Sequence, residues 1–82
     1  MEVFMDYLFK NNPKKPKGWD LFDAIQFRRL KKRIIQAVNE GKFFVDRVYY
    51  VRYNVRMHLK DNGFEVVYAG TFKDEFYKII WN

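Results

Sequence analysis

Apolar residues recur at helical spacing between residues 20 and 40. A stripe with a period of about 3.6 residues is typical of an amphipathic helix with one face in the core. Its members are Phe27, Leu30, Ile34, Ala37 and Val38. Asp20 is a favourable N-cap, Asp23 suits the positive end of the helix dipole, and Gly41 suits a left-handed C-cap. The sequence therefore predicts a helix over residues 20–40.

Residues 48–62 admit two interpretations. With a helical period the apolar stripe is Val48, Val51, Val55 and Leu59. Gly63 then ends the helix, and Phe64 falls where a Schellman motif places a hydrophobic contact. With a period of two, the alternate residues from 51 to 59 are apolar, and Asn62-Gly63 forms a hairpin turn. A single strand over 43–59 would be too long for a small domain, so the helix is favoured.

Short apolar runs over residues 42–47, 64–69 and 76–81 predict three strands. The last two form an antiparallel hairpin whose turn contains Gly70 and residues 73–75. We expect residues 2–9 to form a short N-terminal helix, and residues 10–18, which hold two Pro, to form a basic loop.

Together these elements predict one α+β domain over residues 1–82. Two main helices pack on a short antiparallel sheet that ends in a C-terminal hairpin, in the order α-β-α-β-β. Trp19 is expected to fold back onto Ala24, and Trp81 to pack against a helix. Nine Phe, six Tyr and two Trp supply the core that a chain of 82 residues needs.

The composition excludes several kinds of chemistry. The chain has no Cys and no Ser, one Thr and one His, so neither a nucleophilic site nor a zinc site can be assembled within it. Asp74 and Glu75 near Lys78 are more typical of a turn than of a metal site, and His58 is expected at the surface or at the rim of the core. We therefore predict a protein that is not an enzyme and has no metal or cofactor.

No apolar run approaches the length of about 18 residues that a membrane span needs. The first nine residues carry two acids and no basic leader, so we expect no signal peptide. With no cysteine, a reducing compartment is the simplest location. These features predict a cytoplasmic protein.

Charge adds the first functional indication. Residues 10–33 hold nine Lys or Arg against two Asp, a local net charge of +7 in a chain of net +6. On the predicted helix, Arg28, Arg29, Lys32 and Arg33 form two like-charge pairs at i,i+4, each costing roughly 0.2–0.5 kcal/mol. The loop lysines Lys14, Lys15 and Lys17 extend this field. Such clusters are typical of phosphate contacts, although a solubilising face has the same composition.

A second set of candidate residues interleaves cations with tyrosines. On a helix one face would carry Tyr49, Arg52, Tyr53, Arg56 and Lys60, whereas on a strand the aligned residues would be Arg52, Asn54 and Arg56. This mixture suits stacking on unpaired bases, and it suits a protein interface equally well. The tyrosines could also simply complete the core.

The runs AVNEGKFFV, VRYNVRMHLKDNGFEVVY and FYKIIWN cover residues 34–82. Their order resembles a pattern in small uncharacterised bacteriophage proteins: a helix, a Gly-x-Phe strand, a helix ending before a Gly-aromatic pair, and a strand ending near Trp. The resemblance implies a phage-type origin and supports the helical interpretation of 48–62. It brings no catalytic residues.

We therefore predict a small basic phage-type module in the host cytoplasm that binds an anionic partner, with nucleic acid (DNA or RNA) first. An inhibitor or regulator that covers the working surface of a host protein is the alternative, with an acidic surface as its target. A minor virion component is the third hypothesis.

Overall fold

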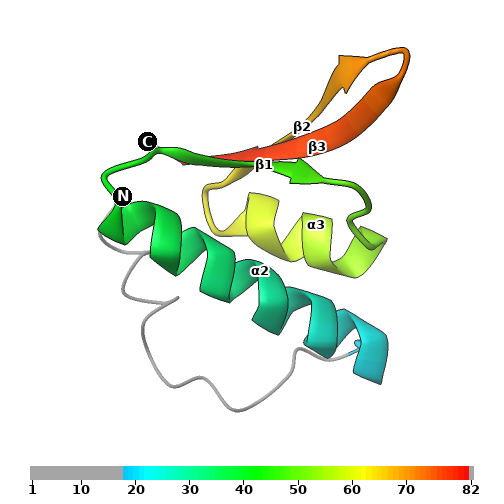
Figure 1. Ribbon diagram of the computed structural model, residues 1–82. Coiled ribbons are helices and arrows are strands. Elements are labelled where there is room, and N and C mark those ends of the chain that lie inside the picture. Colours follow the sequence, from blue (N-terminus) through cyan, green and yellow to red (C-terminus); the bar gives the residue numbers. More distant parts are fainter. Residues whose placement is uncertain (1–17, 82) are drawn as a thin grey trace.

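The computed structural model describes residues 18–81, which form two helices and three strands (Figure 1). The elements are α2 (Leu21–Asn39), β1 (Phe44–Val48), α3 (Tyr53–Asp61), β2 (Glu65–Thr71) and β3 (Asp74–Ile80). This confirms the predicted α+β class and the order of helices and strands. The predicted helix over 2–9 lies outside the described residues, and so does the predicted loop over 10–18 apart from Gly18.

Helix α2 has the ends that the sequence predicts. The Asp20 side chain accepts a hydrogen bond from the Asp23 backbone N–H at 2.9 Å, and the Asp23 carboxylate accepts one from the Asp20 N–H at 3.1 Å. This reciprocal capping box satisfies donors that the first turn leaves free. At the other end Gly41 adopts a φ of +78° and closes the helix with its backbone N–H.

Strand β1 contains a bulge. Val45 pairs with Ile79 and Val48 pairs with Tyr77, so three steps along β1 match two steps along β3. Arg47 takes up the extra residue with a φ of 55°, within the left-handed region. As a result both valines are buried, although simple alternation would place residues three apart on opposite faces of the sheet.

The second predicted helix is confirmed, but it is shorter than expected. It begins at Tyr53, because Val48 belongs to β1 and residues 49–52 form a linker. The residues of the predicted stripe nevertheless reach the core, because Val48 in β1 and Val51 in the linker are both buried. The predicted stop is also confirmed: Gly63 has a φ of +94°, and the Phe64 N–H bonds to the Leu59 carbonyl at 3.0 Å. The strand alternative for this segment is wrong.

The C-terminal hairpin is longer than predicted. Residues 70 and 74–75 lie within the strands, with Gly70 paired to Glu75, so the predicted turn is wrong in position. The two residues that make the turn are Phe72 and Lys73. Phe72 is 92% exposed at this tip. Turns favour Gly, Pro, Asn, Asp and Ser, so the sequence does not predict an exposed aromatic residue there.

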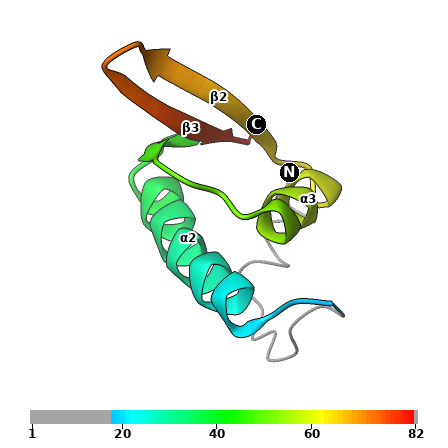
Figure 2. The same cartoon turned by 90° about the vertical axis from the view of Figure 1, so that its right-hand side faces the viewer.

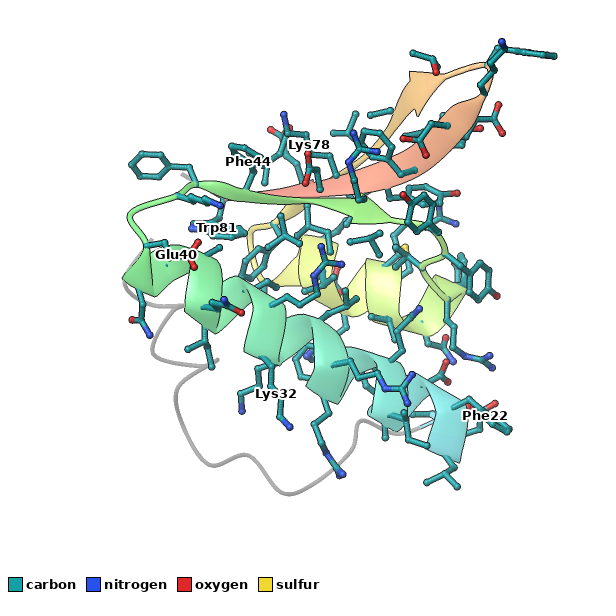
Figure 3. All side chains as sticks on the ribbon, viewed as in Figure 1. Phe22, Lys32, Glu40, Phe44, Lys78 and Trp81 are labelled. Atoms are coloured by element: carbon teal, nitrogen blue, oxygen red, sulfur yellow. The ribbon has the colours of Figure 1, made fainter. Side chains whose placement is uncertain are left out.

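The sheet has the order β1-β3-β2, and both helices lie on one side of it (Figures 1 and 2). The core lies between these layers. Its buried members are Trp19, Leu30, Ile34, Ala37, Val45, Val48, Val51, Val55, Leu59, Phe64, Ile79 and Trp81. Trp81 lies on the helical side of the sheet, whereas Phe44 and Lys78 lie on the other side (Figure 3).

Helix α2 is inclined to the sheet, with its C-terminal end near the strands and its N-terminal end further away (Figure 2). At the N-terminal end of α2, aromatic side chains pack between α2 and α3. Trp19 packs edge-on against Phe27 and against His58, with ring centroids 5.6 and 5.2 Å apart. His58 is thus half-buried between the helices, further in than the predicted rim position, and desolvation lowers its pKa below the ordinary value of 6.5.

Candidate functional site

The predicted cations of α2 lie on its outer surface. Arg28, Arg29, Lys32 and Arg33 are all exposed, and Lys32 points away from the sheet (Figure 3). They do not enter the core, because the helical period places Leu30 and Ile34 on the buried face of α2 and the four cations away from it. Within residues 18–81 none of the four forms an ion pair with a carboxylate. The charge that the sequence predicts on this helix is therefore not neutralised by the described part of the fold.

Two of these arginines border a hollow. It has a volume of ≈ 340 Å³ and is lined by Phe22, Ile25, Gln26, Arg29, Leu30 and Arg33. Of these residues Leu30 is buried, and Phe22 is 64% exposed at the N-terminal end of α2 (Figure 3). Arg33 is held in place because its Nη2 donates to the backbone carbonyl of Asp46 at 2.6 Å. This hollow combines an apolar surface with two cations, and the sequence did not indicate it.

The linker between β1 and α3 runs along the same side of α2. Gln26 fixes it with two hydrogen bonds: its Nε2 donates to the Tyr50 carbonyl at 2.7 Å, and its Oε1 accepts from the Arg52 backbone N–H at 2.8 Å. Tyr49 and Tyr50 remain exposed on this linker, and Tyr53 is exposed at the start of α3. Because Tyr49 precedes α3, the predicted helical face that joins it to Tyr53 and Arg56 is not formed.

Arg52 is a structural residue in this arrangement. Its Nε donates to Asp23 Oδ1 at 2.6 Å, and its Nη2 donates to Asp20 Oδ2 at 3.1 Å. Asn54 Nδ2 donates to the other Asp23 oxygen at 3.0 Å. These hydrogen bonds, led by the one from Asn54, lower the Asp23 pKa to about 2 although its carboxylate is buried. Arg52 therefore joins the starts of α2 and α3 and is not free for a phosphate.

Arg56 lies on the other flank of α3. Its guanidinium is 5.9 Å from the centre of the Tyr77 ring of β3, whereas Asn54 and His58 contact α2. The cations of α2 and α3 are thus separated by α3 itself and do not merge. Lys14, Lys15 and Lys17 lie outside the described residues.

The acidic residues that could have suggested a metal site have other roles. Asp74 pairs with Arg47, whose guanidinium also lies 5.2 Å from the centre of the Phe76 ring. The Glu75 carboxylate accepts a hydrogen bond from Tyr68, which raises the pKa of that tyrosine. Among residues 18–81 no group of His, Asp or Glu is arranged to hold a metal ion.

In the described part of the chain, neither helix combines the length and apolar character of a membrane span. No known protein family, curated protein or solved structure matches this chain.

Proposed function

We propose that this protein is a non-enzymatic module that binds nucleic acid through the exposed cations of α2. One observation carries the proposal: Arg28, Arg29, Lys32 and Arg33 have no carboxylate partner within residues 18–81. A cluster kept at the expense of like-charge repulsion is best explained by an anionic partner. Its setting would be the cytoplasm of a bacterial host, in keeping with the phage-type resemblance.

A polyanion fits this helix better than a single small anion. The four cations extend over two turns, and Arg28–Lys32 and Arg29–Arg33 form two adjacent rows. All four are exposed in the described part of the chain, so a lone phosphate would gain little beyond exposed contacts. A phosphate backbone meets several of them at once and releases condensed counterions from each.

Salt dependence of binding tests the proposal. Four phosphate contacts predict that the logarithm of the affinity falls with the logarithm of salt concentration with a slope of about −2.8 on a single strand. Reversing two of the charges, in Arg29→Glu/Lys32→Glu, should abolish binding at moderate salt and leave the far-ultraviolet circular dichroism unchanged. Fluorescence anisotropy with a labelled oligonucleotide measures both effects.

A charge-matched control separates position from net charge. Lys60 and Lys73 are exposed cations on α3 and at the hairpin tip, away from α2. The variant Lys60→Glu/Lys73→Glu has the same net charge as the α2 variant and should keep most of the affinity. Equal loss in both variants would show a general attraction without a site, and no binding by the wild type at low salt would refute the function.

A second candidate is a protein that binds and regulates a host protein. The observation in its favour is the exposure of Tyr49, Tyr50 and Tyr53, since tyrosine is a preferred anchor of protein interfaces. Affinity capture after nuclease treatment distinguishes the two functions. An identified partner bound at one-to-one stoichiometry, and lost in Tyr50→Ala but kept in Arg29→Glu/Lys32→Glu, would favour this candidate.

A further inference from the structure

The hollow on α2 is not explained by phosphate contacts alone. A helix that met only a phosphate backbone would need its cations, but it would not need an apolar recess between them. Here Ile25 and Leu30 lie beside Arg29 and Arg33, and Phe22 stands at one end with 64% of its surface exposed. A ligand that fills this recess must carry an apolar surface next to a negative charge.

We propose that this hollow receives an unpaired nucleobase, so that the partner of α2 is single-stranded nucleic acid. The inference rests on the proposed function and names the form of nucleic acid that it takes. In a duplex the bases are stacked inside and cannot enter a recess on a protein surface unless they are flipped out. A single strand offers its bases freely beside its phosphates.

The dimensions and the charge favour this occupant. A volume of ≈ 340 Å³ lies at the lower end of ligand sites, which span about 300–1,000 Å³, and suits one planar ring system. Arg29 and Arg33 are one helical turn apart at the border of the hollow, where they meet the phosphates on either side of the base. Arg33 is already oriented by the Asp46 carbonyl, and its remaining N–H groups are available to a ligand.

A second aromatic surface lies along the path that the strand would take. Gln26 lines the hollow and binds the Tyr50 carbonyl, which places the linker against this part of α2. Tyr50 is 63% exposed there, so its ring is accessible to the next base. Successive stacking on aromatic rings beside a basic groove is the usual way in which proteins hold single strands.

The affinities of the full chain for labelled oligo(dT) and for a labelled duplex test the inference. Phe22→Ala should weaken oligo(dT) binding by about 5- to 150-fold, the usual contribution of one stacked base. Duplex binding should change by less than about twofold, since it depends on the cations alone. Phe22→Tyr keeps a stacking ring and should restore the affinity for oligo(dT).

Phe72→Ala is the matched control. It removes an equally large exposed ring at the hairpin tip, away from α2, and should change neither affinity. The centre of the Phe22 ring also lies 5.7 Å from Arg52 Cζ, so Phe22 contacts a residue that joins the two helices. Circular dichroism therefore checks that each variant is folded.

Each other outcome is informative. If Phe22→Ala weakens single-strand and duplex binding equally, or weakens neither of them, the base site is refuted while electrostatic binding stands. If the wild type binds no nucleic acid at low salt, the proposed function fails with it. If an acidic peptide containing Phe binds in place of oligo(dT), and this binding is lost in Phe22→Ala, the occupant is a protein segment and the inference is overturned.

Discussion

Four arginines of this protein fall into two groups that the sequence alone does not separate. Arg47 and Arg52 each pair with an acid and lie near an aromatic ring. Arg28 and Arg29 have no carboxylate partner within residues 18–81. The pairs of the first group join residues 27 and 29 positions apart, so no local pattern reveals them. For this reason the prediction included Arg52 as a binding residue, although its side chain is engaged in the fold.

Two glycines allow a direct test of how the backbone determines stability. Gly70 has a φ of +103°, and an added Cβ would overlap the Asp74 carbonyl oxygen across the hairpin. Gly41 has a φ of +78°, but an added Cβ would meet nothing within 4 Å. Gly41→Ala should therefore cost only the strain of the left-handed conformation, about 1–2 kcal/mol. Gly70→Ala should cost more, because the strands must also separate locally.

Urea unfolding followed by circular dichroism measures both glycine variants against the wild type. If the two variants lose the same free energy of unfolding, the close approach at Gly70 has no energetic consequence. A cost at Gly41→Ala well above ~2 kcal/mol would contradict the open space around this residue.

The elements were predictable where local signals determine them. Capping residues and glycines define the ends of α2 and the end of α3, and the sequence showed both. The start of α3 was not predictable, because the linker satisfies its backbone polar groups through Gln26, 24 to 26 residues away. The bulge at Arg47 was missed for a similar reason: only pairing with β3 shows that Val45 and Val48 share a face.

Gln26 therefore carries a prediction about how the linker is held on α2. Gln26→Ala leaves the exposed Tyr50 carbonyl and the partly buried Arg52 N–H without this partner, and each lost hydrogen bond costs roughly 0.5–1.5 kcal/mol. We expect a total loss of about 1–3 kcal/mol in the free energy of unfolding. Hydrogen exchange of the Arg52 amide should accelerate as well.

Gln36 supplies the control on the same helix. It is exposed, and within residues 18–81 its side chain hydrogen-bonds only to Glu40, four residues on, at 3.3 Å. Gln36→Ala should therefore change stability by less than about 0.5 kcal/mol. If the two alanine variants are equally stable, Gln26 does not hold the linker.

At the scale of the whole molecule, the division of roles follows the layers. The starts of α2 and α3 are joined by an ionic network around Asp23 and by the rings of Trp19, Phe27 and His58. At this end α2 diverges from the strands (Figure 2). Polar and aromatic contacts thus hold α2 to α3 where α2 no longer lies against the sheet. The fold class and the core stripes follow from sequence periodicity, but these contacts between the helices depend on tertiary structure.

This arrangement predicts two separate losses of stability on acidification. The His58 pKa is lowered by desolvation, so the folded state favours the neutral ring, and its contribution is complete above the ordinary pKa of 6.5. That contribution falls as the pH drops below 6.5, because the unfolded chain then binds a proton that the folded chain resists. The Asp23 contribution is complete above the ordinary pKa of 3.8 and is lost as the pH falls towards about 2.

Free energies of unfolding measured in urea between neutral pH and the acid limit should therefore fall in two steps. His58→Phe keeps a ring between Trp19 and Phe27 and should remove the first step alone, since phenylalanine does not titrate. Asn54→Ala removes the principal hydrogen bond that lowers the Asp23 pKa, so it should reduce the second step and leave the first. Asn39→Ala, at an exposed position of α2, should change neither step. A wild-type profile that stays flat down to pH 4 would contradict the role of His58, and an unchanged second step in Asn54→Ala would contradict that of Asp23.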